Sequence, residues 1–317
     1  MRPDLLDPEW QGSEAPGEVG RAVALGPRKL ISPGVLAMVC SAFDGELLLP
    51  EDIEQLHDHR PLTAGSHESK THTEVFTSSD DSAIAVVRVD YSDEMPIAHL
   101  DLLATDAGHR RRGKAGLVLD AAENWAIEMG ADWIEVGDHI PWGLFSGVDV
   151  RWTAAMCLFG TRGYERVAVK LDLACPTIST SPARPGAGLR AVRVEEDDQI
   201  EDLRAFVAEV SPRNLAAFDQ AGEWGTAVVA VDGKSGCIFG AAAHSLQRTG
   251  VIGPVIARAG VNERILTAVL MRTVLSDLAT AGVKSAEIVG ALTMPPYVDS
   301  VGAKVARVSL VLRRKLV

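Results

Sequence analysis

Three segments in the first third of the chain either alternate apolar with polar residues at the period of a β-strand or are apolar almost throughout. The segments are residues 71–79, 82–91 and 96–105. They are rich in β-branched residues and are separated by the turn-forming sequences SDD and SDEMP, so they predict an antiparallel meander. Residues 114–129 then repeat apolar positions at helical spacing up to Gly130, which predicts an amphipathic helix. A strand is expected immediately after it, at 132–137.

Shorter segments complete the first half of the chain. Two short helices are expected before the meander, and a third short helix and a further strand are expected after residue 150. These segments are 33–49, 50–60, 153–162 and 164–173. The break that follows, CPTISTSPARPGAG at 175–188, has no apolar periodicity and is rich in Pro, Ser, Thr and Gly. It predicts a linker between two domains.

The same order of elements returns beyond this linker. The expected strands are 188–195, 225–233, 237–246, 250–259, 285–290 and 304–315, and the expected helices are 197–210 and 263–280. The segment from Gly130 to Gly137 overlays that from Gly282 to Gly290 at an offset of about 152 residues, each after a long helix. We interpret this as duplication of a whole domain, because two unrelated α/β units would need the same order and the same glycine stops by accident.

The pattern therefore predicts an α/β (α+β) protein with two similar domains, each a mixed, mostly antiparallel sheet flanked by helices. We expect the domains at 1–174 and 189–317, with the linker at 175–188. A length of 317 residues agrees with two domains.

Composition limits the classes of function. Hydrophobic residues make up 47% and charged residues 23% of the chain, which excludes a mostly disordered protein. A formal net charge of −12 argues against nucleic acid and anionic membranes as partners. The most apolar helical segment, 265–281, is interrupted by Arg272 and Asp277, and the acidic amino terminus lacks the pattern of a signal peptide. We expect a cytoplasmic protein without a membrane span, as a monomer or homodimer.

The four cysteines predict neither a metal site nor a disulfide framework. They lie far apart, with no CxxC pair and no histidine at ligand spacing. We expect buried, reduced thiols, and at Cys157 a small buried hydrophobic residue rather than a covalent nucleophile.

One basic turn carries the candidate chemistry. It follows the strand 96–105 and opens the helix 114–129, and it holds Arg110, Arg111, Arg112, Gly113, Lys114, Ala115 and Gly116. The first N–H groups of a helix have no partner within the helix, and small side chains let a pyrophosphate approach them. The alternative is a solvated basic turn without a ligand. No GxxxxGK[ST] P-loop and no Rossmann glycine pattern occurs.

Here the chain resembles the GNAT N-acetyltransferase superfamily, whose signature is R/Q-x-x-G-x-G/A at the start of this helix. Arg110, Gly113 and Ala115 match that signature, and residues 155–164 are similar to the later motif A-x-x-L-Y-x-K-x-G-F. The resemblance implies that acetyl-CoA is the acyl donor and lies on the turn 110–116. It also implies that the backbone of Leu103, Ala104 and Thr105 pairs with the pantetheine arm.

The resemblance further implies a base that deprotonates the acceptor amine. His99 stands on the strand where some family members carry a catalytic glutamate, and Asp101, two residues on, shares its face. His139 follows the strand 132–137 and is a second candidate. The alternatives are a hydrogen-bonded strand histidine at 99 and a solvated loop histidine at 139.

Two departures from the family pattern concern the acid and the acceptor. The usual acidic tyrosine is replaced by Phe159, so water or another residue must protonate the leaving thiolate, and we expect Tyr164 in the core. Trp142, Phe145 and Trp152 either line an apolar acceptor pocket or pack against the second domain.

The second half lacks the signature. Its aligned turn reads Val261-Asn262-Glu263-Arg264-Ile265-Leu266, in which the small residues are lost and a glutamate would repel phosphate. We expect no acetyl-CoA there, and we expect this half to complete the substrate cleft or support the first domain. The sequence thus predicts an acetyl-CoA-dependent N-acyltransferase acting on a small-molecule amine. The alternative is a non-catalytic acyl-CoA-binding sensor of the same fold.

Overall fold

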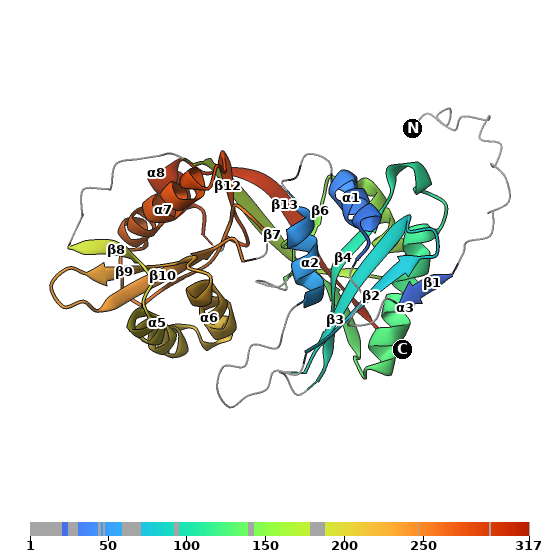
Figure 1. Cartoon of the computed structure of the whole chain (residues 1–317), viewed down its shortest axis with the longest axis horizontal. Coiled ribbons are helices and arrows are strands. Elements are labelled where there is room, and N and C mark those ends of the chain that lie inside the picture. The colour runs from blue at the N-terminus through green and yellow to red at the C-terminus, as the bar shows by residue number, and fades with distance from the viewer. Residues whose placement is uncertain are drawn as a thin grey trace, which may run out of the picture.

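A computed structural model describes most of the chain. The described residues are 21–24, 31–43, 46, 48–58, 71–91, 95–138, 143–177, 188–246, 248–291 and 293–316. They form two lobes that are joined by long strands in the middle of the molecule (Figure 1).

The first half follows the expected order. Its elements are β1 (Ala22–Ala24), α1 (Pro33–Ala42), α2 (Pro50–Asp58), β2 (Thr71–Ser78), β3 (Ala83–Asp90), β4 (Ile97–Thr105), a 3-10 turn (Ala107–His109), α3 (Lys114–Glu128), β5 (Trp133–Val136), β6 (Val148–Asp149), α4 (Thr153–Thr161) and β7 (Glu165–Pro176). The antiparallel meander is confirmed, since β2 pairs with β3 and β3 with β4, both antiparallel. The helix expected at 33–49 ends earlier, at Ala42.

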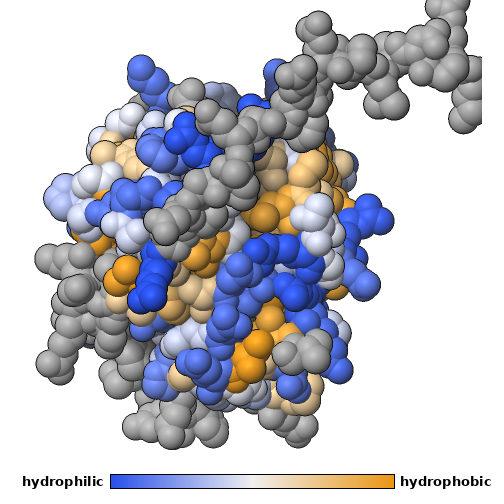
Figure 2. Space-filling view, turned by 90° about the vertical axis from the view of Figure 1, so that its right-hand side faces the viewer, coloured by the Kyte–Doolittle hydropathy of each residue, from blue (hydrophilic) through white to orange (hydrophobic). Residues whose placement is uncertain are grey.

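The first-half sheet is buried on both faces. Ala85 and Val87 of β3 pack in the core that contains α3, whereas Ile84 and Val86 pack in the core that contains α1 and α2. This two-sided burial explains why β3 reads as a nearly continuous apolar run. On the side of this lobe that faces away from the other lobe, apolar areas are separated by hydrophilic side chains (Figure 2).

The second half repeats this plan. Its elements are β8 (Leu189–Arg193), α5 (Asp197–Val210), a 3-10 turn (Pro212–Asn214), α6 (Leu215–Glu223), β9 (Ala227–Asp232), β10 (Ile238–His244), β11 (Val251–Ala257), α7 (Glu263–Thr280), β12 (Ser285–Ile288), α8 (Pro295–Val301) and β13 (Lys304–Lys315). α6 and α8 were not predicted, because both are short: α8 begins at Pro295 and α6 follows the 3-10 turn that begins at Pro212, and such a pattern also fits a loop.

The two glycines that stop the long helices have matching backbone conformations. Gly130 has φ of 85° and Gly282 has φ of 83°, the left-handed conformation that ends many helices. This correspondence supports the inferred duplication. Within the described residues, no helix combines the length and apolar character needed to cross a bilayer.

The last strands of the two halves are exchanged, which the sequence did not reveal. β13, from the end of the second half, pairs with β5 of the first half, and β7 of the first half pairs with β12 of the second. β7 and β13 also pair with each other, so the strands form one continuous sheet. Both long strands run between the lobes in Figure 1.

This exchange changes how the predicted linker is understood. Cys175 and Pro176, at the start of the expected linker, belong to β7, and Cys175 is buried against the second half. Residues 178–187 lie outside the described part. The sequence division into 1–174 and 189–317 therefore does not coincide with strand pairing, because each half contributes its final strand to the sheet of the other.

The exchanged strand packs very closely against the end of β5. A Cβ atom built on Gly137, which has φ of 93°, would lie 2.5 Å from Gly147 Cα, and one on Gly147 would lie 2.6 Å from the carbonyl oxygen of Leu310 in β13. Three backbone segments thus meet where only glycine fits.

We expect Gly137→Ala to destabilise the protein more than Gly130→Ala. Both glycines have positive φ, which costs about 1–2 kcal/mol for alanine, but a Cβ on Gly130 meets nothing within 4 Å. The backbone clash at Gly137 adds about 1–3 kcal/mol. Urea unfolding of the two variants measures the difference, and equal losses would contradict the close packing.

Candidate active site

The site begins where β4 and β5 separate. The two strands pair in parallel only from Ile97 opposite Trp133 to His99 opposite Glu135, while β4 continues to Thr105. The register of β4 against β3 shifts between Leu100 and Leu102, so Asp101 is the extra residue of a β-bulge. A bulge bends a strand and increases its twist, which accounts for the separation of β4 from β5.

A cavity of about 980 Å³ occupies this opening and extends to the start of α3. It is lined by nine of the ten predicted cofactor residues, namely Leu103, Ala104, Thr105, Arg110, Arg111, Gly113, Lys114, Ala115 and Gly116. The structure thus brings the end of β4 and the basic turn to one cavity. Arg112 is not among the lining residues.

The amino terminus of α3 is open toward the cavity. Gly113 is its N-cap in the left-handed conformation, with φ of 77° and no side-chain cap. The helical bonding begins with the N–H of Leu117 donating to the carbonyl of Gly113 at 2.9 Å. The N–H groups of residues 114–116 therefore have no acceptor within the helix, which leaves them able to bind an anion.

Cations around this terminus are held by defined partners. The Lys114 ammonium lies 2.9 Å from Asp80, and Arg110 Nη2 donates to the carbonyl of Ala42 at 3.2 Å. Arg162, at the end of α4, pairs with Asp120 and donates to the carbonyl of Gly116. Sequence analysis missed Arg162 as a cavity residue, although it precedes the Gly163 of the later motif.

The base candidates have different surroundings. Asp101 lines the cavity, and its Oδ2 accepts a hydrogen bond from Arg88 Nε at 3.1 Å in a buried ion pair. His99 faces Arg88 across β3 and β4 and is not among the lining residues. Sequence analysis missed Arg88, because a charged residue within an apolar strand gives no sign of its partner. His139 lies outside the described residues.

The described part of the chain holds no cluster of three or more His, Cys, Asp or Glu side chains suited to a metal ion. The expectation of buried thiols is wrong for Cys157 and Cys237, which are exposed, whereas Cys175 is buried. Cys157 lines the cavity because its face of α4 turns toward the opening rather than the core.

Comparisons with known proteins identify the fold. No protein-family model and no curated protein matches the sequence. Among solved structures, a GCN5-related N-acetyltransferase from Sphaerobacter thermophilus superposes with a TM-score of 0.64 over 95% of this chain and 97% of its own, at 16% identity. A tandem GNAT protein from the clavulanic acid biosynthesis pathway gives 0.63 over 94% and 98%, at 15% identity.

The chain has a tandem GNAT fold. A glucosamine N-acetyltransferase region of a fungal multidomain β-N-acetylglucosaminidase also matches, with a TM-score of 0.68 and 17% identity over 88% of this chain. The chain spans 36% of that larger protein.

We call the first and second halves of the chain the first and second GNAT units. No tyrosine lines the cavity of the first unit. The chain contains three tyrosines. Tyr91 donates to the carbonyl of Met129, Tyr164 donates to Glu123 in the core as expected, and Tyr297 is buried in the second unit. Phe159 packs against Tyr164 with ring centroids 4.9 Å apart. The family's acidic hydroxyl therefore has no equivalent among these tyrosines.

Three aromatic rings form the wall of the cavity near α1 and the start of α4. Phe43, Phe145 and Trp152 all line the cavity, and their centroids lie 5.0, 5.2 and 5.1 Å apart. We call these three residues the ring wall. Phe145 and Trp152 both contact Arg307 of β13, so the predicted packing against the second half is confirmed, and both also line the cavity. Trp142 lies outside the described residues.

In the second GNAT unit, the turn that corresponds to the basic turn 110–116 leaves no room for an anion. We call each of these two turns a cradle. The side chain of Asn262 caps α7 by accepting from the N–H of Ile265 at 3.2 Å. Leu266 is buried, and a Cβ on Gly240 would lie 2.6 Å from its side chain. Tyr297 lies in the same core, where burial raises its pKa to about 12. The Asn262 side chain thus accepts from one of the helix N–H groups that an anion would otherwise use.

We expect Lys114→Met to raise the pKa of Asp80. The Lys114 ammonium, followed by the hydroxyls of Ser82 and Ser78, holds that pKa well below its usual range. A lowered carboxyl pKa stabilises the fold above the ordinary value and loses this effect as the pH falls. The difference in melting temperature between wild type and variant should thus shrink from pH 7 toward pH 3. Carboxyl NMR titration measures the pKa directly, and Lys304→Met, at the exposed start of β13, is the control.

Proposed function

We propose that this protein is an acetyl-CoA-dependent N-acyltransferase that acetylates a small-molecule amine, with the donor bound to the first GNAT unit. The fold supports acyl transfer in general terms. The observation that carries the proposal is the uncapped start of α3, where three N–H groups without helical acceptors face the same cavity as the unpaired edge of β4.

The residues present fit the donor chemically. In this proposal the pyrophosphate accepts from the N–H groups of residues 114–116, where the helix dipole and Arg111 favour negative charge. At residues 103–105, the edge of β4 that faces away from β3 has no partner strand, and it offers the pantetheine amides the hydrogen bonds of a strand. A free N–H of β4 directed at the thioester carbonyl would stabilise the developing oxyanion.

The reaction needs one proton removed and one delivered. The amine nitrogen attacks the thioester carbon, the carbon–sulfur bond breaks, and the amine proton passes to a base. Asp101 is the candidate base that lines the cavity, and Arg88 beside it fixes its carboxylate. His99 and His139 remain the other candidates. Because no tyrosine lines the cavity, water protonates the departing thiolate in this scheme.

A second candidate function is an acyl-CoA sensor that binds without turnover. The lack of a tyrosine hydroxyl in the cavity and the closed cradle of the second unit favour it. The two proposals differ in one observable, because only the enzyme releases free CoA thiol in the presence of an amine.

Calorimetric titration of acetyl-CoA should give one site per chain. Ala115→Glu should abolish it, because the new carboxylate would stand among the N–H groups of α3, while a glutamate in the first turn of a helix leaves the fold intact. Glu263→Gln, at the matching turn of the second unit, should leave both stoichiometry and affinity unchanged. Two sites in wild type would contradict the closed second cradle, and no site would overturn the donor assignment.

Release of CoA thiol with a panel of amines should identify the base. If Asp101 is the base, Asp101→Asn lowers kcat by about 100-fold or more, as removal of a positioned base does. Cys157→Ala, in the same cavity, should change kcat by no more than about twofold. Loss with His99→Ala but not with Asp101→Asn would move the role to His99, and tight binding without thiol release from any amine would favour the sensor.

A further inference from the structure

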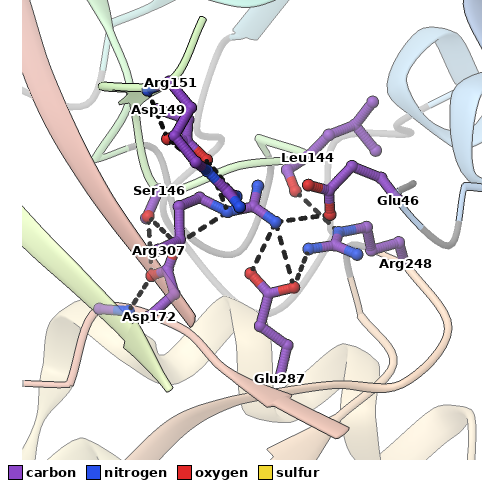
Figure 3. A network of polar contacts seen from close by, with 10 residues as sticks. Glu46, Leu144, Ser146, Asp149, Arg151, Asp172, Arg248, Glu287 and Arg307 are labelled. Carbon is purple, nitrogen blue, oxygen red and sulfur yellow. Dashed lines mark hydrogen bonds and ion pairs between the residues drawn. The ribbon is translucent and has the colours of Figure 1, made fainter. Parts of the chain in front are cut away.

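A buried cluster of charges lies where the two GNAT units meet. Arg307 of β13 contacts carboxylates from both units, with Glu46 and Asp149 from the first and Glu287 of β12 from the second (Figure 3). Arg248, between β10 and β11, pairs with the same Glu287. Both arginines are almost fully buried, with 4% and 3% of their surface exposed.

Both arginines pack on the ring wall. The guanidinium carbons of Arg248 and Arg307 each lie 5.1 Å from the centroid of Phe145, and that of Arg307 lies 5.8 Å from Trp152. Nη1 of Arg307 is buried and has no hydrogen-bond partner among the described residues. A desolvated cation over an aromatic face is strongly attracted to it, so these contacts hold the rings in place.

Further bonds from the second unit fix the segments that carry these rings. Arg248 Nε donates to the carbonyl of Leu144, next to Phe145, at 3.2 Å. The N–H of Thr249 donates to Asp52 of α2 at 3.2 Å. Arg307 holds Glu46, three residues after Phe43. The contacts of Arg248 and Arg307 join the second unit to the segments that carry Phe145 and Phe43, and the contact of Thr249 joins it to α2.

We propose that Arg248 and Arg307 are positioning residues through which the second GNAT unit supports the ring wall on the acceptor side of the first unit's cavity. The inference rests on the proposed function for the acceptor, but its geometry does not depend on turnover. The cradle residues 110–116 would bind the donor, and the ring wall would receive the acceptor. The second unit, whose own cradle is closed, would thus act by orienting Phe145 and Trp152.

The test uses Arg248→Lys and Arg307→Lys, which keep the charge but remove the planar group that stacks on the rings. Arg258→Lys is the matched control, because Arg258 also lies over a ring, that of Phe206 at 5.5 Å, and pairs with Glu209. Protein labelled with 5-fluorotryptophan reports each tryptophan separately by fluorine NMR, and Trp152→Phe assigns the resonance of interest.

We expect the Trp152 resonance to shift in Arg307→Lys and, through Phe145, in Arg248→Lys. Trp224, in the second unit, should keep its resonance in both, which shows that the fold is intact, and Arg258→Lys should leave Trp152 unchanged. An unchanged Trp152 resonance in both cavity variants would overturn the proposal, whether or not the protein turns over any amine.

Steady-state kinetics distinguish an effect on acceptor binding from an effect on donor binding. With an amine that supports thiol release, both variants should raise the acceptor KM by about tenfold or more while acetyl-CoA affinity stays within about twofold of wild type. Equal losses in donor and acceptor binding would indicate general damage and overturn the positioning role. If wild type binds no acetyl-CoA, the proposed function fails, and the fluorine spectra still decide whether the arginines orient the ring wall.

Discussion

The backbone pairing of β13 between β5 and β7 is the interaction on which the rest of the structure depends. Because the last strand of each half pairs within the sheet of the other, the two GNAT units form one sheet, and neither can complete its sheet alone. Arg307 lies on this strand, so the exchange also carries a buried cation into the region between the units. Its carboxylate partners from both units compensate the cost of burying that charge.

The two units share the same order of elements but differ at the start of the long helix. Each has a long helix that ends at a glycine with positive φ, followed by a strand. In the first unit the helix starts at Gly113 without a side-chain cap, which leaves N–H groups for a ligand. In the second, Asn262 caps the helix and Leu266 fills the space below Gly240. A few side chains at one helix terminus thus distinguish an uncapped terminus beside a cavity from a capped terminus on a packed core.

The cavity of the first unit combines an electropositive end and an aromatic end. Arg110, Arg111 and Lys114 surround the helix terminus in a protein whose net charge is −12, so attraction for an anion is local rather than global. The ring wall lies elsewhere in the same cavity and is backed by arginines of the second unit. The second unit therefore supports one wall of the first unit's cavity.

Periodicity was enough to predict most helices and strands, including α5, α7 and β13 at their observed bounds, because these features depend on neighbours within one turn or one strand. Local chemistry singled out the basic turn 110–116, and six of its seven residues line the cavity. Strand partners, the Arg88–Asp101 pair and the contacts of Arg248 and Arg307 with Phe145 were decided only by tertiary structure. The physical reason is that a strand with apolar residues satisfies its backbone equally well beside several edges, and a buried charge shows its partner only after distant segments have packed together.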